Sequence, residues 1–178
     1  MFARTFELAL VVSATALLPA AAFGQQYVGS EKCKTCHNAK DKGEMYTKWK
    51  ATQHAKAFET LGSEAAKKLN KGADAQKEGK CLKCHNTEAA VPADKLAKSF
   101  KKDQGVGCES CHGPGDKHVK ARMASEDDST VTDAEVVRAP GEKTCLTCHN
   151  KESPTFKGFK FAEAAKKIEH KNPSKKSQ

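Results

Sequence analysis

Large apolar side chains are scarce in this chain. Only 6% of its 178 residues are aromatic, with one tryptophan and two tyrosines, while 30% are charged. A domain of this length normally buries a sizeable core of aromatic and branched aliphatic side chains. The composition therefore excludes an ordinary aliphatic interior and predicts a fold that obtains most of its buried apolar surface from another source.

Strand patterns are nearly absent as well, whereas proline-free stretches of good helix formers are frequent. Turn residues separate these stretches. We therefore expect a mainly α fold of short helices and loops, with little or no β structure. The expected helices are residues 44–61, 63–69, 118–125 and 161–170, and the expected loops are Val91-Pro92, 105–107, 139–141 and Ser153-Pro154.

The one long apolar run, Leu8 to Leu18, is shorter than the roughly 20 residues that span a bilayer. Arg4 precedes it and small residues follow it, which is typical of a secretory signal cleaved after Ala22 or Gly24. We expect a signal peptide over 1–24, a periplasmic protein without stable membrane insertion, and no nucleic-acid partner. An uncleaved anchor is the alternative, and the absence of a cysteine at the cleavage site gives no indication of a lipid anchor.

Cysteine, by contrast, is placed with strict regularity. Two thiols three positions apart can add to the two vinyl groups of one heme, and a histidine directly after them can bind the iron. Zinc in two Cys₄ sites is the alternative, but zinc gives no reason for a histidine after every second cysteine. All eight cysteines lie in four such runs: Cys33, Cys36 and His37; Cys81, Cys84 and His85; Cys108, Cys111 and His112; Cys145, Cys148 and His149.

The four runs predict four covalently bound heme c groups, with short helices and loops wrapped around them. One tetraheme domain is expected over 25–171, followed by a disordered serine- and lysine-rich tail over 172–178. The hemes themselves would then supply the core that the side chains lack.

Histidine is in short supply for four irons. The chain has seven histidines, four of them in the runs, which leaves His54, His118 and His170 as distal ligands. One iron would then lack a distal histidine. Met45, Met123 or a lysine amine could fill that position, or it could stay open.

The spacing of these three histidines limits which iron each can reach. His118 lies six positions after His112, at most about 20 Å of chain, so we expect it to serve a neighbouring heme. His54, on the same expected helix as Met45, is free to reach across to another heme. His170 could close around the fourth heme.

The formal net charge of +9 is offset by the heme propionates, so the holoprotein should be mildly basic. Paired lysines are read most simply as solvated faces, and docking to an acidic redox partner is the more specific alternative. These pairs are Lys67-Lys68, Lys101-Lys102 and Lys166-Lys167.

Several motifs resemble the tetraheme cytochrome c-554 family, named for the electron acceptor of hydroxylamine oxidoreductase in ammonia-oxidising bacteria. The resemblance covers most of the chain after the expected signal peptide. Its marks are residues 27–30 (Tyr-Val-Gly-Ser), Trp49 with Thr52 and His54-Ala55, residues 105–115 with His118, residues 153–156 (Ser-Pro-Thr-Phe) and residues 168–170 (Ile-Glu-His).

The resemblance implies three bis-histidine hemes and a five-coordinate second heme, which assigns the open iron to His85. Pro154 and Phe156 would line its open face. The implied distal pairs are His118 with His37, His54 with His112, and His170 with His149. The implied partners are redox proteins, namely a multiheme oxidoreductase as donor and a membrane quinone-linked cytochrome as acceptor.

These observations favour a periplasmic electron carrier, because the chain has no acid–base constellation that would suggest an ordinary enzyme. The alternative is binding or reduction of a small ligand such as nitric oxide at the open heme of His85. A heme filament, with ligands exchanged between copies, is a third hypothesis, although exchange between identical chains cannot supply a further histidine.

Overall fold

The computed structural model describes residues 25–125 and 131–173. The expected signal peptide over 1–24, and all but the first two residues of the expected tail over 172–178, lie outside the described residues.

The described chain is mainly helical, which confirms the predicted fold class. It contains no strand, and its only β feature is an isolated parallel bridge between Tyr27 and Leu96. Four short 3-10 helices, η1 to η4, occupy Lys40–Lys42, Ala75–Lys77, Glu88–Ala90 and Ala93–Lys95. The α-helices are α1 (Ser30–His37), α2 (Met45–Lys50), α3 (Ala57–Leu61), α4 (Glu64–Leu69), α5 (Gly79–His85), α6 (Cys108–His112), α7 (Asp116–Ala124), α8 (Glu142–Leu146) and α9 (Phe161–Ile168).

The helix expected over 44–61 is two helices, α2 and α3, joined by a turn at 51–56. Thr52 explains the break. Its hydroxyl donates to the carbonyl oxygen of Trp49 at 2.7 Å and accepts from the amide of Ala55 at 3.4 Å, so it competes with the helical ladder. His54 therefore lies in the turn, and the expectation that Met45 and His54 share one helix is wrong.

The other expected helices are found with slightly different ends, as α4, α7 and α9. The helices at the Cys-x-x-Cys-His runs were not predicted. The first three runs lie wholly within α1, α5 and α6, and the fourth run begins in α8. A helical turn places residues three and four positions apart on one face, so both thiols and the imidazole of a run point the same way.

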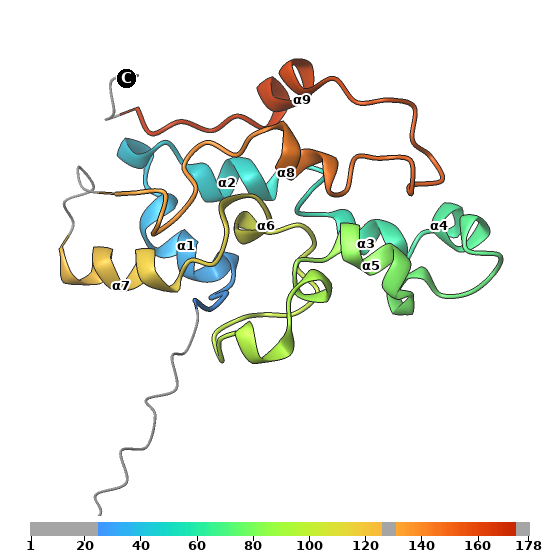
Figure 1. Ribbon diagram of the computed structural model, residues 1–178, viewed down its shortest axis with the longest axis horizontal. Helices are drawn as coiled ribbons and strands as arrows, with labels where there is room; N and C mark the ends of the chain where they lie inside the picture. Colours follow the sequence, from blue (N-terminus) through green and yellow to red (C-terminus); the bar gives the residue numbers. More distant parts are fainter. Residues whose placement is uncertain (1–24, 126–130, 174–178) are drawn as a thin grey trace, which may run out of the picture.

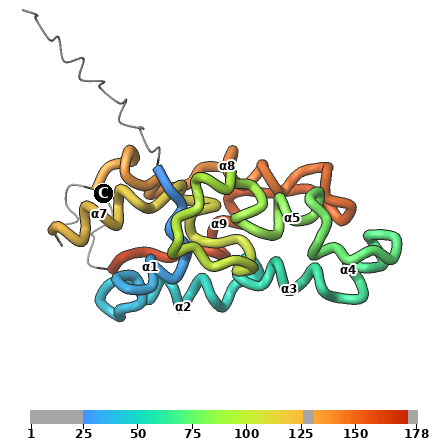
Figure 2. The backbone as a smooth tube through the Cα atoms, turned by 90° about the horizontal axis from the view of Figure 1, so that it is seen from below, coloured from blue at the N-terminus to red at the C-terminus, as the bar shows by residue number. Residues whose placement is uncertain are grey.

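The third run lies near the middle of the fold (Figure 1). In that view α7 lies at one end of the long axis and α4 at the other. The segment after α9 returns along α2 to the end where α1 and α7 lie, and Figure 2 shows the same arrangement from below. Residues close to the C-terminus therefore meet residues close to the first run.

A buried carboxylate fixes the third run to the start of the domain. Glu109, in α6, has an exposed fraction of only 4%. Its Oε1 accepts from the amides of Val28 at 2.8 Å and Gly115 at 2.7 Å, and its Oε2 accepts from Gly29 at 2.7 Å. Burial raises the pKa of Glu109 above its ordinary value, and the three backbone hydrogen bonds act in the opposite direction.

Polar side chains beside the first and second runs also bond to the segment around the start of the third. Ser30, at the start of α1, accepts from the amide of Cys108 through its hydroxyl at 3.2 Å. Thr87, which follows α5, accepts from the amide of Gly107 at 2.7 Å and pairs with the Ser110 hydroxyl at 2.7 Å. Three of the four runs thus meet around one short segment.

The side-chain core is as thin as the composition predicts. Its buried apolar cluster consists of Tyr46, Trp49 and Ala55, with Cys108 packed against it. The indole of Trp49 donates to the carbonyl oxygen of Val106 at 2.9 Å. None of the large described side chains is less than 2% exposed. No described helix has both the length and the apolar character needed to cross a membrane.

We predict that Glu109→Gln lowers the free energy of unfolding of the holoprotein by about 1–3 kcal/mol, because an amide –NH₂ would face a backbone N–H that needs an acceptor. Urea unfolding followed by far-UV circular dichroism measures the change. Exposed Glu59→Gln is the matched control, with an expected change within about 0.5 kcal/mol. Equal stability of the two variants would contradict the assigned role of Glu109.

Candidate functional site

Six of the seven histidines form three ring pairs, each joining segments far apart in the sequence. The ring centroids of His37 and His118 lie 6.1 Å apart, those of His54 and His149 lie 5.9 Å apart, and those of His112 and His170 also lie 5.9 Å apart. Every pair contains one histidine from a Cys-x-x-Cys-His run and one of the three histidines outside the runs. Among the described residues, His85 is the histidine left outside these pairs.

The separation of the rings suits two imidazoles bound to opposite sides of one metal ion. A metal–imidazole bond of about 2 Å on each side, plus about 1 Å from each ligating nitrogen to its ring centre, gives roughly 6 Å between centroids. The observed separations match this value. The residues present therefore fit bis-histidine ligation of heme iron.

The structure corrects two of the expected pairs. His118 lies with His37, as the resemblance implies. His54, however, lies with His149 rather than with His112, and His170 lies with His112 rather than with His149. The reason is the course of the C-terminal segment, which passes back toward the first run and carries His170 away from the fourth.

Backbone carbonyl oxygens face Nδ1 of three histidine rings. The Nδ1 of His85 lies 3.0 Å from the oxygen of Ala57, and that of His112 lies 2.6 Å from the oxygen of Val137. The Nδ1 of His170 lies 2.9 Å from the oxygen of Ile168. A hydrogen bond from Nδ1–H orients the ring and leaves Nε2 free to bind a metal.

A charged side chain faces the ring of His118. The Nδ1 of His118 and the carboxylate of Glu135 are 3.7 Å apart. Arg122, one turn further along α7, lies at the same distance from that carboxylate. The ring on α7 is thus placed in a charged environment, in contrast to the rings that face peptide carbonyls.

Burial favours the neutral, metal-binding form of two of the rings. It lowers the pKa of His54, and the neighbouring His149 adds to the effect. It also lowers the pKa of His112, with His170 adding to the effect and the hydrogen bond to Val137 opposing it. Because only a neutral imidazole can bind iron through Nε2, the lowered pKa values favour ligation.

The thiols show which runs are neighbours. A hydrogen bond joins the thiols of Cys33 and Cys108, raising the pKa of the first and lowering that of the second. Burial and the nearby Cys148 raise the pKa of Cys84 to about 11, and burial followed by the nearby Cys145 raises that of Cys111 to about 11. The first run therefore adjoins the third, the second adjoins the fourth, and the third adjoins the fourth.

A cavity of about 290 Å³ opens between these runs. Its lining includes Cys84 from the second run, Ser110 from the third and Cys148 from the fourth. All eight cysteines lie in the described residues and none forms a disulfide. In the same part of the chain no three metal-binding side chains come together as a site for a single ion.

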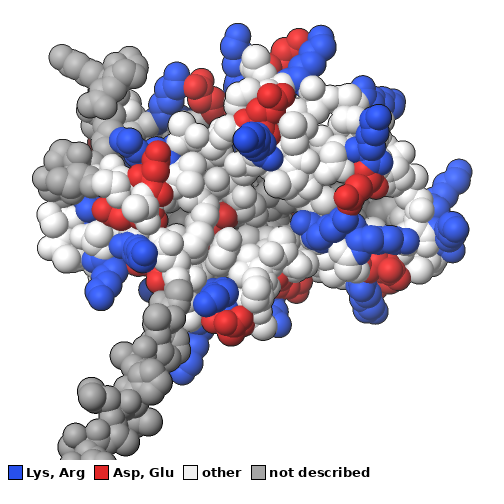
Figure 3. Space-filling view, in the orientation of Figure 1, with Lys and Arg blue, Asp and Glu red and all other residues white. Residues whose placement is uncertain are grey.

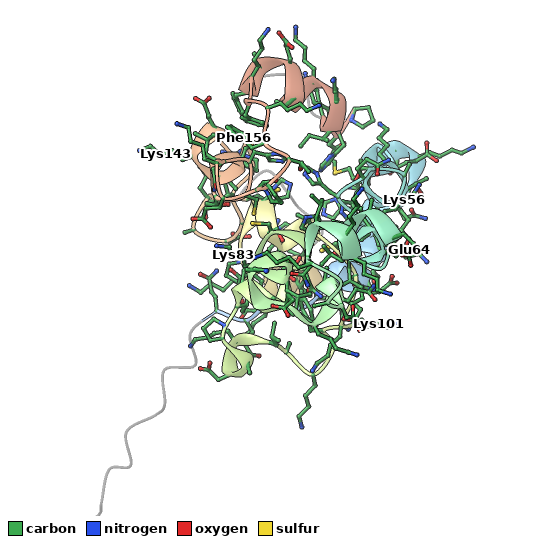
Figure 4. All side chains as sticks on the ribbon, turned by 90° about the vertical axis from the view of Figure 1, so that its right-hand side faces the viewer. Lys56, Glu64, Lys83, Lys101, Lys143 and Phe156 are labelled. Atoms are coloured by element: carbon green, nitrogen blue, oxygen red, sulfur yellow. The ribbon has the colours of Figure 1, made fainter. Side chains whose placement is uncertain are left out.

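One ion pair links the helix of His85 to the segment after the fourth run. Segment 151–160 is tied to α5 by an ion pair between Glu152 and Lys83. In Figure 4, Lys83 lies below the segment that carries Phe156, on the same side of the molecule. Pro154 is exposed and Phe156 is half-buried, and neither lines the cavity described above.

The sequence did not single out Phe159, which stacks on the ring of His149 with 4.8 Å between centroids and 19° between planes. Nor did it single out Glu135 or the carbonyl groups that face the Nδ1 atoms. An aromatic ten residues after a heme-run histidine was the only available signal for Phe159. Nothing local marks a backbone carbonyl as a partner, because every residue carries one.

Charge is spread over the surface. The paired lysines Lys67-Lys68, Lys101-Lys102 and Lys166-Lys167 are all exposed. Figure 3 shows basic side chains around the rim of one face, with acidic side chains among them. On this face, charges of both signs are mixed, as on a solvated surface, and do not form a single basic patch.

Comparison with known proteins identifies the family. The model of the family described as cytochrome c554 and c-prime matches residues 32–113, which include three of the four runs. Cytochrome c-554 of Nitrosomonas europaea is 33% identical over 151 residues, an alignment that covers 75% of this chain and 62% of the relative. The chain thus spans a little under two thirds of that relative's length.

A solved structure of reduced cytochrome c554 from Nitrosomonas europaea is also similar. It is 31% identical, and the match covers 77% of this chain and 72% of that chain with a TM-score of 0.49. The sequence relationships, together with the four heme-attachment runs, lead to one conclusion. The chain belongs to the tetraheme cytochrome c-554 family, and its cofactor is heme c.

Proposed function

We propose that the protein is a tetraheme electron carrier in which three irons have two histidine ligands each and the fourth has one. The observation that carries this proposal is the set of three ring pairs about 6 Å apart. The thioether attachments would be made by the cysteines of the four runs, and His37, His85, His112 and His149 would be the proximal ligands. The distal ligands would be His118, His54 and His170.

Heme iron supplies reversible one-electron chemistry, and the protein sets its potential through the axial ligands and their surroundings. Contacts between the runs support a continuous order of first, third, fourth and second. Electrons could then pass between neighbouring groups without leaving the chain. Two histidine ligands per iron should hold most of the potentials below those of histidine/methionine cytochromes.

The proposed location is the periplasm, with residues 1–24 removed as a signal peptide and 25–171 forming the tetraheme domain. Heme attachment and the apolar run from Leu8 to Leu18 support it. The proposed partners are redox proteins, with a multiheme oxidoreductase as donor and a membrane quinone-linked cytochrome as acceptor.

A second candidate function is binding or reduction of nitric oxide at the iron of His85. Two observations favour an open site there. Every other histidine belongs to a ring pair, and α7, which carries Met123, lies at the opposite end of the molecule from α5 (Figures 1 and 2). Met123 is also 79% exposed, and α2 begins with Met45 on the side of α1. Neither methionine is placed to serve His85.

Rapid mixing distinguishes the two functions. The fully reduced holoprotein would be mixed with a ferric high-potential monoheme cytochrome and, separately, with nitric oxide. An electron carrier should deliver four electrons per molecule to the cytochrome, one from each heme. Failure to reoxidise with the cytochrome, together with reoxidation by nitric oxide that becomes sustained reduction to nitrous oxide when excess reductant is supplied, would favour the enzyme instead.

We predict that about one quarter of the iron in the oxidised protein is high spin, because one of four hemes would lack a second strong ligand. Electron paramagnetic resonance with spin quantified against total heme measures this fraction. Added nitric oxide should alter the high-spin signal and leave the low-spin signals in place. Four low-spin hemes would mean that a methionine, a lysine or another group completes the iron of His85.

We also predict that Phe156→Ala speeds ligand binding to the ferrous protein severalfold, because removing the ring would widen access to the iron of His85. Flash photolysis of the carbon monoxide adduct measures the rate. Phe100→Ala, which removes a half-buried ring that lies against Gly29 beside the first run, is the matched control. If both variants rebind at the wild-type rate, segment 153–156 does not cover the open face.

A further inference from the structure

A tight contact joins the segment after His170 to the turn that follows the first run. Gly43 is buried and has φ of +87°, a conformation that residues with a Cβ rarely adopt. A Cβ built on Gly43 would overlap the carbonyl oxygen of Lys171 and would lie 3.1 Å from Cδ of Pro173. The backbone next to His170 therefore rests directly on the Cα of this glycine.

The turn that carries Gly43 is itself well held. The amide of Gly43 donates to the carbonyl oxygen of Lys40 at 3.0 Å, and the next amide, of Glu44, donates to the oxygen of Ala39 at 3.1 Å. A side chain at position 43 could not be accommodated by a small movement of the turn. It would displace the C-terminal segment instead.

A second buried glycine with positive φ contacts the backbone at another of the paired histidines. Gly105 is buried with φ of +73°, and a Cβ there would lie 2.7 Å from the carbonyl oxygens of both His54 and Ala55. The His54 carbonyl accepts from the amide of Val106 at 2.9 Å. On its other side, Gly105 accepts from the amide and hydroxyl of Thr87 at 3.0 and 3.1 Å. The backbone at His54 thus packs against a glycine whose carbonyl group is hydrogen-bonded to Thr87, next to the second run.

We propose that Gly43 is a positioning residue for the axial ligand His170: its lack of a side chain lets the C-terminal segment approach the first-run turn closely enough to bring His170 opposite His112. The proposal rests on the ligation pattern proposed above. Gly105 plays the corresponding part for His54 opposite His149. Two of the three ring pairs would then depend on a glycine, because the missing side chain leaves room for the backbone at or next to the ligating histidine.

Gly43→Ala tests the proposal, with Gly72→Ala as the matched control. Gly72 also has a left-handed conformation, with φ of +90°, but no atom lies within 4 Å of a Cβ built there. Any effect of backbone conformation alone is therefore shared by the two variants. The readout is the high-spin fraction of the oxidised, fully heme-loaded protein by electron paramagnetic resonance.

The wild type should show about one quarter high-spin iron, and Gly43→Ala about one half, because a second iron loses its distal ligand. Exogenous imidazole should return the iron that lost His170 to the low-spin state. Gly72→Ala should match the wild type. In Gly43→Ala/His170→Ala the fraction should equal that of His170→Ala alone, because both changes act on the same iron.

A heme-loaded Gly43→Ala protein with the wild-type fraction would overturn the proposal, as would a double variant with about three quarters high-spin iron, which would place the effect at another heme. A wild type without the quarter fraction would instead contradict the ligation pattern. The two failures are therefore distinct. Gly105→Ala should likewise leave one iron without its distal ligand. Because that iron is a different one, its high-spin fraction should add to that of His170→Ala.

If Gly43→Ala does not accumulate as holoprotein, a chain ending at His170 removes the Lys171 carbonyl and with it the overlap. In that background Gly43→Ala should accumulate and should have the same high-spin fraction as the shortened chain with Gly43. Failure of the shortened Gly43→Ala chain, alongside normal yield of the shortened Gly43 chain, would show that the glycine serves its own turn and would overturn the proposal.

Discussion

The meeting of histidine rings from distant segments, which we propose to close on one iron per pair, is the interaction on which the rest of this structure depends. The domain buries few large side chains, and its apolar cluster consists of Tyr46, Trp49 and Ala55. Coordination at these pairs would join segments that packing alone leaves weakly connected. Each ring pair links residues 58 or more positions apart, and together the pairs join α1 to α7, the α2–α3 turn to the segment after α8, and α6 to the C-terminal segment.

Around these pairs the protein supplies a polar framework of its own, centred on the third run. The carboxylate of Glu109 holds the start of the domain, Ser30 connects α1, and Thr87 connects the segment after α5. Buried hydrogen bonds of this kind are costly to leave unmade, so they specify position strongly even where their net contribution to stability is modest. Gly43 and Gly105 extend this framework, because each lets a second backbone segment approach closely.

Much of this could be read from the sequence, because its strongest signals are local. Attachment of heme by a run such as Cys33 to His37 needs only five adjacent residues, and the shortage of histidines is a matter of counting. Which distal histidine meets which iron was harder. The expected partners of His54 and His170 were exchanged, since pairing depends on the course of the chain between distant segments and not on spacing. The Thr52 hydroxyl that ends α2 is likewise visible in the sequence only as one residue of a helix-compatible stretch.

Anomalous diffraction at the iron edge from crystals of the holoprotein tests the ligation pattern most directly. The account predicts four iron peaks, three of them midway between the paired rings of His37 and His118, of His54 and His149, and of His112 and His170. The fourth should lie at Nε2 of His85 with no second protein ligand. A peak shared by His54 and His112, or by His170 and His149, or a protein side chain completing the iron of His85, would contradict it.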